Sequence, residues 1–150
     1  GSDQLITKMG SIVQSVNNLD YLPPVLSMED IQSTTAQEWI SLLQQIIDYS
    51  NYNVVILDLS DSVSQLYKVL EQCTRIYMPI RADPVSQAKI QQFEHTLQVW
   101  EKQVVLERIQ KIKLPYHRSS KTGIGYMDDL VWSELGDYVR EMLRTEREDG

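Results

Sequence analysis

The stretch Asn53-Val54-Val55-Ile56-Leu57-Asp58-Leu59 decides the expected fold class of this chain. It places four consecutive apolar residues, three of them β-branched, directly before a carboxylate and the turn-prone residues Ser60-Asp61-Ser62. Such a continuous apolar run is typical of a strand buried on both faces, as in a parallel sheet covered by helices. Because ligands of these sheets bind beyond the carboxyl ends of the strands, Asp58 lies where nucleotide- or metal-handling carboxylates lie. The alternative is that Asp58 only caps the next helix or hydrogen-bonds a loop, and this run alone does not decide between the two.

The composition is typical of a soluble globular protein. The chain has 150 residues, 42% hydrophobic and 23% charged, which is enough for a single domain with its own core. Its formal net charge of −7 argues against a general nucleic-acid or anionic-membrane surface. We find no secretory signal and no apolar run long enough for a transmembrane helix, and the single cysteine, Cys73, cannot form an internal disulfide. We therefore expect a cytoplasmic protein in which Cys73 is a buried, inert thiol.

Helical and strand-like patterns alternate along the chain. Helices are predicted over 3–17, over 35–51 behind the capping-box sequence Thr35-Ala36-Gln37-Glu38, over 66–73 behind Ser62 and Gln65, from Asp83-Pro84 onward, and from near Met127 onward. Strands are predicted over 19–22, 53–59, 75–80 and 109–114. This order predicts an α/β fold, a layered and mostly parallel sheet of about three to four strands flanked by helices. Trp39, Trp100 and Trp132 fall on helical stripes and are predicted to be core residues.

Several kinds of catalytic site lack their motif in this sequence. There is no glycine-rich phosphate loop, since Lys121-Thr122-Gly123 follows no strand directly and lacks the leading glycines. His95 and His117 stand apart, without the spacing or the cysteine partners of a metal cage. No GxSxG motif is present, so a hydrolase triad is not indicated. The basic stretch from Lys113 to Lys121 is either a solvated loop or a phosphate contact, and we favour the loop.

The order of the elements resembles the carboxyl-terminal half of a MinD/ParA-like deviant-Walker P-loop ATPase. In that family a strand of the pattern YDxVIIDxPP carries the Walker-B-like aspartate, and Tyr52 to Asp58 is similar to it. The stretch 75–80, Arg-Ile-Tyr-Met-Pro-Ile, resembles a later strand that ends in xxIPV, and Leu19 to Pro24 resembles an upstream LPxG segment. The resemblance covers about residues 19–143, and it is greatest to the pilus- and secretion-associated TadZ/CpaE-like branch.

The resemblance implies a set of site residues and cofactors. Asp58 would orient the water shell of a magnesium ion in a complete parent protein, and Pro115 would shape the pocket for the nucleotide base. Asp61 stands, with Ser60, where the family has two prolines, and it completes the candidate cofactor-binding residues. The P-loop part of the family fold has no counterpart here, so we expect no cofactor on this chain by itself, with ATP and magnesium bound only by the parent. On this reading Gly1-Ser2 is the remnant of an expression tag, and 3–150 is the carboxyl-terminal part of an ATPase-like domain.

The missing part of the family fold has a physical consequence. The absent strand would lie between those that match 53–59 and 75–80, and open apolar edges invite pairing. We therefore expect either that 53–59 pairs directly with 75–80 or that the chain dimerises. Its partners would be other protein chains, without nucleic acid, and membrane association would come only through the parent or through partners.

Two other functions remain open from the sequence. One is a non-catalytic adaptor that acts through its helices or through an exposed sheet edge. The other is a receiver-like signalling domain with Asp58 as phospho-acceptor, because Val54 to Ser60 also resembles the acceptor strand of a receiver. A receiver should also carry an early acidic pair and a later Lys-Pro, and this sequence has no Lys-Pro.

Overall fold

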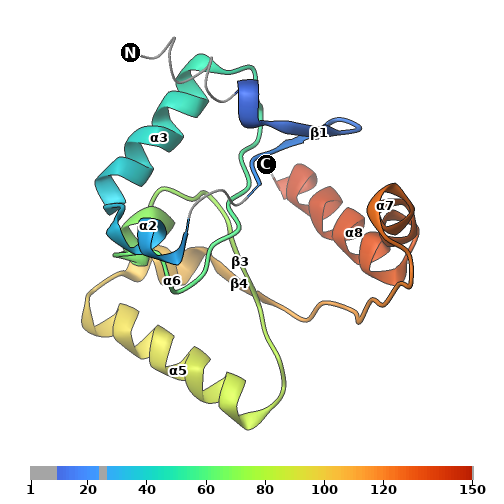
Figure 1. The fold of residues 1–150 in the computed structure, drawn as a ribbon. Coiled ribbons are helices and arrows are strands. Elements are labelled where there is room, and N and C mark those ends of the chain that lie inside the picture. The colour runs from blue at the N-terminus through green and yellow to red at the C-terminus, as the bar shows by residue number, and fades with distance from the viewer. Residues whose placement is uncertain (1–9, 24–26, 150) are drawn as a thin grey trace. The chain divides into compact units, whose positions relative to one another are not determined.

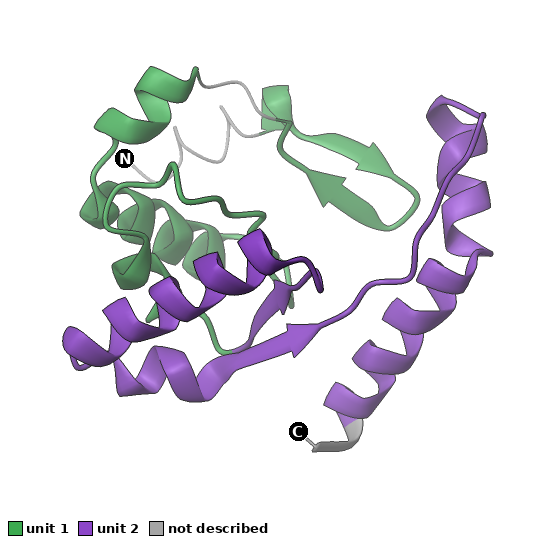
Figure 2. Ribbon diagram, turned by 90° about the horizontal axis from the view of Figure 1, so that it is seen from below, with its two compact units in different colours: residues 1–74 green, residues 75–150 purple. Residues whose placement is uncertain are grey.

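The computed structural model describes residues 10–23 and 27–149 (Figure 1). They fall into two units, residues 1–74 and residues 75–150, which Figure 2 shows in different colours. Each unit combines helices with one two-stranded sheet, antiparallel in the first unit and parallel in the second. The α/β class is therefore confirmed, whereas a layered sheet of three or four parallel strands is not seen among the described residues.

Residues 14–21 form a β-hairpin. Strand β1 (Gln14–Val16) pairs antiparallel with β2 (Leu19–Tyr21), which confirms the strand predicted over 19–22. Asn17 turns the chain with a φ of 55°, in the left-handed region that asparagine tolerates. The helix predicted over 3–17 is therefore wrong for residues 14–16. Residues 10–12 are helical, and the first part of that prediction lies outside the described residues.

Two helices of the first unit begin with capping boxes. Helix α2 (Met28–Ser33), which we did not predict, begins with a capping box between Ser27 and Asp30. Helix α3 (Ala36–Tyr49) begins with the predicted capping box of Thr35 and Glu38, and buries Ala36 and Ile46. It packs against α4 (Leu66–Leu70), a shorter form of the helix predicted over 66–73, and the buried side chains of α4 are Val69 and Leu70.

Residues 53–59 form no strand, so the prediction of a buried strand here is wrong. The segment is irregular, and the side chains of Val54 and Ile56 are 73% and 77% exposed. Within the described part of the chain, no backbone hydrogen bond involves these residues. A buried strand needs neighbours that pair its N–H and C=O groups. Because the described residues supply no such neighbour, the segment forms no strand, and only Leu57 and Leu59 in it are half-buried. Direct pairing with 75–80 does not occur, and dimerisation stays a prediction.

The second unit is built on a parallel strand pair. Strand β3 (Ile76–Pro79) pairs with β4 (Ile109–Ile112) in the register Ile76↔Ile109 to Pro79↔Ile112. Both strands were predicted, and Pro79 lies at the strand end, as expected. Parallel strands need a crossover, and here it consists of α5 (Pro84–Val99) and α6 (Gln103–Arg108). Asp83 caps α5 as predicted, because its carboxylate accepts a hydrogen bond from the backbone N–H of Ser86 at 2.9 Å.

The core of the second unit lies between the crossover helices and the sheet. Its buried side chains are Leu97 on α5, Val105 on α6 and Ile112 on β4. An ion pair of 2.6 Å between Lys111 Nζ and Glu94 Oε1 joins β4 to α5 at the edge of this core. Tyr77 of β3 has a buried hydroxyl. This burial, together with the nearby negative charge of Glu146, raises the pKa of Tyr77 to about 12.

The helix predicted from Met127 is in fact two helices, α7 (Gly123–Val131) and α8 (Glu134–Asp149). The backbone before and after the break at Trp132 and Ser133 lies close together. A Cβ atom added to Gly136 would lie only 2.3 Å from the Val131 carbonyl oxygen. Trp132 is 81% exposed and Arg140 lies over its ring, and Trp100 is 53% exposed. The prediction of core tryptophans is therefore wrong for both, and only Trp39 is half-buried.

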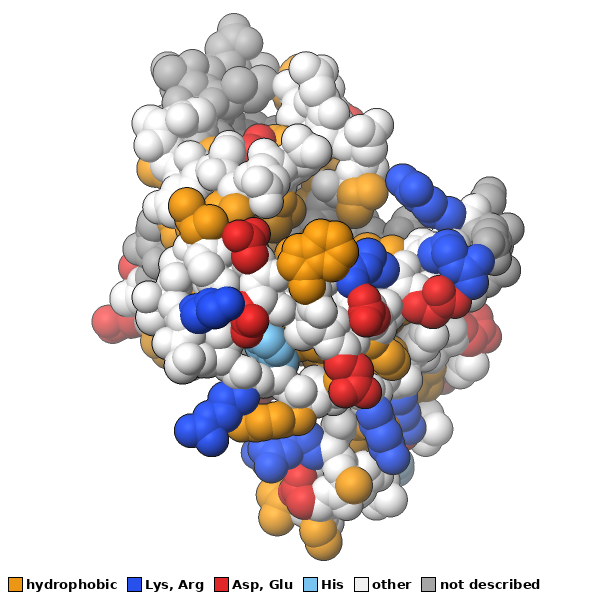
Figure 3. Space-filling model, turned by 90° about the vertical axis from the view of Figure 1, so that its right-hand side faces the viewer, with side chains coloured by type: hydrophobic (Ala, Val, Ile, Leu, Met, Phe, Trp, Pro, Cys, Tyr) orange, Lys and Arg blue, Asp and Glu red, His pale blue; other side chains and the backbone are white. Residues whose placement is uncertain are grey.

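The surface carries charges of both signs. Figure 3 shows exposed hydrophobic side chains interspersed with acidic and basic ones on one face. No helix in the ranges 10–23 and 27–149 combines the length and the apolar character needed to cross a bilayer.

Two neighbouring valines of α6 test this description of the core. Val105 is fully buried and Val104 is 50% exposed. Val105→Ala removes two buried methyl groups and should lower the free energy of unfolding by about 2 kcal/mol. The matched control, Val104→Ala, should change it by less than about 0.5 kcal/mol. Urea unfolding followed by circular dichroism measures both, and equal losses would contradict the burial of Val105.

Candidate functional site

The predicted site residues belong to two different units of the structure. Asp58 is exposed in the irregular segment, and Asp61 is exposed in the turn that follows it. Both belong to the first unit, whereas Pro115 lies half-buried after β4 in the second unit. Among the described residues no group of three or more His, Cys, Asp or Glu side chains is placed to hold a metal ion. The roles assigned to these three residues stay predictions.

The basic stretch Lys113 to Lys121 is only partly the solvated loop that we favoured. Its His117 side chain is 9% exposed, and the ring lies edge-on to Tyr126 at a centroid distance of 5.7 Å. Asp129 of α7 faces the loop, with Oδ2 3.9 Å from His117 Nε2 and Oδ1 3.6 Å from Lys121 Nζ. A hydrogen bond from Ser119 and the positive charge of Lys121 lower the pKa of Asp129. The Asp129 carboxylate thus anchors this loop to α7. An anion that approached the loop would be repelled by this carboxylate.

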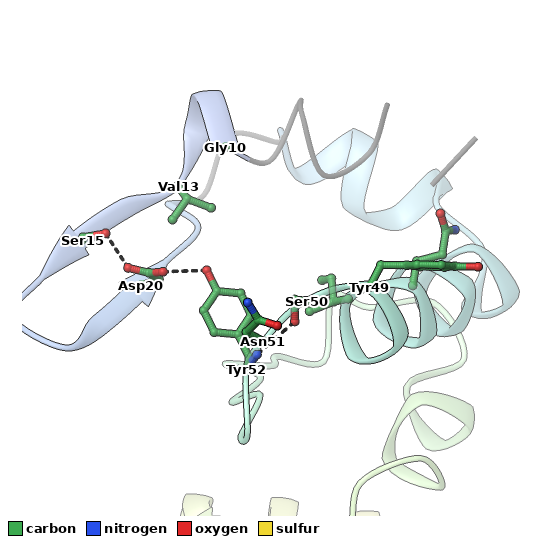
Figure 4. Close-up of a pocket in the computed structure, with 10 residues that line it drawn as sticks. Gly10, Val13, Ser15, Asp20, Tyr49, Ser50, Asn51 and Tyr52 are labelled. Carbon is green, nitrogen blue, oxygen red and sulfur yellow. Dashed lines mark hydrogen bonds between the residues drawn. The ribbon is translucent and has the colours of Figure 1, made fainter. Parts of the chain in front are cut away.

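A cavity in the first unit brings polar side chains together. It has a volume of about 510 Å³ and lies between the hairpin β1–β2 and the carboxyl-terminal end of α3 (Figure 4). The hairpin contributes Ser15 and Asp20 to its wall, and the chain after α3 contributes Asn51 and Tyr52. Pockets of roughly 300–1,000 Å³ are the size that small ligands occupy in proteins.

Asp20 is the centre of the hydrogen bonds in this cavity. The Ser15 hydroxyl donates to Asp20 Oδ1 from the directly opposite position of the hairpin. The Tyr52 hydroxyl donates to Asp20 Oδ2 at 2.6 Å and thereby joins two segments that are 32 positions apart in the chain. Figure 4 shows both bonds converging on the carboxylate. Because the two sides of Asp20 are held from different elements, its carboxylate has a fixed orientation toward the cavity.

These hydrogen bonds also set the charge of the site. The bond from Ser15, followed by the bond from Tyr52, lowers the pKa of Asp20, so that the group is an anion at neutral pH. The same bond to Asp20 raises the pKa of Tyr52, since the hydroxyl must keep its proton to donate it. At neutral pH the cavity therefore contains a carboxylate and a protonated phenol.

Sequence reasoning did not find this cavity. It placed Asp20 in a short strand and Ser15 in a helix. It therefore did not predict that the two residues lie opposite each other in a hairpin. The available signal was Asn17-Asn18, which suits a hairpin turn between residues 14–16 and 19–21. Comparison with known proteins adds no assignment, because no family model, curated protein or solved structure matches the chain.

The bond between Asp20 and Tyr52 predicts linked titrations. Replacing Tyr52 with Phe should raise the pKa of Asp20 toward its usual range, and replacing Asp20 with Asn should lower the pKa of Tyr52. The stabilisation that the Asp20 bonds provide should be present above about pH 4 and be lost as the pH falls through the lowered pKa of the folded protein. Carboxyl-carbon NMR reports on Asp20, and ring-carbon NMR of Tyr52 reports on its hydroxyl.

Tyr49→Phe is the matched control, since Tyr49 also lines the cavity but points away from Asp20 in Figure 4. An Asp20 pKa that responds equally to both tyrosine changes would contradict the bond.

Proposed function

We propose that the chain is the carboxyl-terminal part of a MinD/ParA-like ATPase domain, whose parent positions or assembles a membrane-associated machine of the pilus or secretion type. The chain by itself is not catalytic in this proposal, because its sequence contains no phosphate loop. Asp58 and Asp61 then belong to the nucleotide end of the parent domain, and Pro115 belongs to its base pocket. ATP and magnesium bind only when the phosphate-binding part is present.

The observation that carries the proposal is the parallel pairing of β3 with β4 across a helical crossover. This is the arrangement that the resemblance predicts for the two strands after the Walker-B-like segment. Strand β3 ends at Pro79, near the place where the family strand ends in xxIPV, and the following helix opens at Asp83 and Pro84. The finer statement, a P-loop fold with a layered parallel sheet, remains part of the proposal.

The exposed segment 53–59 forms no strand here, and the proposal assigns its pairing partner to the rest of the parent domain. Val54 and Ile56 are more than two-thirds exposed, although residues of this type are normally buried in strands. Their exposure is expected if the neighbouring strand of the family fold is supplied from outside the described residues. The same exposure favours the second candidate, a non-catalytic adaptor that receives a strand from another chain, because an unpaired apolar edge is a template for pairing.

The ATPase proposal predicts a KGGxGK[ST] motif upstream in the same reading frame, and tight binding of ATP and magnesium by the protein that includes it. In that protein Asp58→Asn should lower the rate of ATP hydrolysis by about 10- to 100-fold, because an aspartate that orients metal-bound water is lost. Glu29→Gln, a change of an exposed carboxylate on α2, is the control and should leave the rate unchanged.

Calorimetric titration of the 150-residue chain alone should detect no micromolar binding of ATP or ADP with magnesium. Micromolar binding by the chain alone would contradict the claim that it lacks a phosphate site. Absence of the upstream motif would overturn the ATPase proposal in favour of the adaptor. Sedimentation velocity would then show whether the partner is a second copy of the chain.

A further inference from the structure

The cavity of the first unit offers several hydrogen-bond acceptors, and the donors of Ser15, Tyr52 and Gln45 are already used. The hydroxyl protons of Ser15 and Tyr52 are both directed at Asp20. The side-chain N–H of Gln45 points back to the carbonyl oxygen of Ser41 at 3.3 Å. The free lone pairs of Asp20 and the amide oxygens of Gln45 and Asn51 therefore remain for a ligand. A ligand that fits this set must bring its own donors.

Charge selects the same kind of ligand. The described residues that line the cavity include the Asp20 carboxylate but no lysine or arginine. Two hydroxyl donors hold this carboxylate in its ionised form, and neither donor neutralises its charge. A cation is the ligand that compensates such a charge most fully.

The rest of the wall suits a short apolar stem. Val13 and Ile46 line the cavity together with Tyr52, whose ring offers a face to a cation or to methylene groups. An aliphatic chain of a few carbons fits easily in about 510 Å³. A primary ammonium carries three N–H donors on such a stem, whereas an anion would be repelled by the Asp20 carboxylate.

We propose that this cavity is a binding site for a primary ammonium group on a short aliphatic stem, with Asp20 as its counter-ion. The ammonium group donates to the free lone pairs of Asp20 and to the amide oxygens of Gln45 or Asn51, and the stem lies against Val13 and Ile46. Its source is either a free alkylamine or polyamine or the side chain of a lysine in a polypeptide. The proposal does not depend on the ATPase proposal, since no residue of the cavity belongs to the predicted nucleotide site.

The test is an NMR titration of the chain with n-butylammonium chloride, with 1-butanol as the neutral ligand of the same shape. We expect saturable shifts of the Ser15, Asp20 and Tyr52 amide signals with the amine, weakened by added salt. Butanol should cause no comparable shifts. Asp20→Asn should weaken amine binding by about fivefold, the loss expected for an exposed ion pair.

Two further variants keep the result interpretable if Asp20→Asn disturbs the hairpin. Tyr52→Phe keeps the carboxylate that serves as counter-ion, so it should weaken amine binding less than Asp20→Asn does. Glu29→Gln removes an exposed charge of the same sign from α2, outside the cavity wall, and should not change binding. Equal binding of butanol and butylammonium, or undiminished binding by a folded Asp20→Asn variant, would overturn the proposal.

The two sources of the ammonium group are separated by two more ligands. Tighter binding of N-acetyl-lysine methylamide than of butylammonium supports a lysine side chain in a polypeptide. Tighter binding of spermidine than of the lysine derivative supports a free polyamine.

Discussion

The requirement that buried backbone groups be hydrogen-bonded determines which parts of this chain are ordered as sheet. Strands β3 and β4 satisfy it for each other, since the crossover through α5 and α6 returns the chain parallel to its start. The buried side chains of Leu97, Val105 and Ile112 then form the core between this strand pair and the crossover helices. The apolar segment 53–59 has the composition of a third strand but no partner among the described residues, and so it remains irregular and exposed. The chain thus forms sheet where a pairing partner is present among the described residues, and it is irregular at 53–59, where none is present.

Features with a local physical cause were predictable from the sequence. The capping box of Thr35 and Glu38 and the opening of α5 at Asp83 depend on residues that are adjacent in the chain. The strand at 76–79 was also found, because its apolar run ends at a proline that cannot continue a ladder. These signals do not require knowledge of distant contacts.

Features that depend on distant or tightly packed groups were not predictable. The run at 53–59 was read as a strand, and its apolar, β-branched character says nothing about whether a neighbour exists to pair with it. The hairpin at 14–21 was hidden, because Val13 and Val16 fit helical spacing as well as a strand. The cavity around Asp20 depends on the bond to Tyr52 from a different element, and no spacing rule connects those two residues. Trp132 fitted a helical stripe that the break between α7 and α8 interrupts.

The two proposals address different parts of the first unit and can fail separately. The unpaired segment 53–59 supports a role that needs a further strand, from the parent domain or from a partner. The hydrogen bonds that hold Asp20 lie within the described residues, and they need no further strand. An ammonium ligand would therefore bind in this cavity whether or not a nucleotide site is completed elsewhere.

The central claim is that residues 53–59 have no pairing partner among the described residues, whereas β3 and β4 are paired. Amide hydrogen exchange, read residue by residue by NMR, tests it most directly, because exchange reports which backbone N–H groups are hydrogen-bonded. We expect the amides of 53–59 to exchange at close to the rate of an unfolded chain, and those of the β3–β4 pair to be protected. Protection of 53–59 equal to that of the β3–β4 pair, in the monomeric chain, would contradict the account.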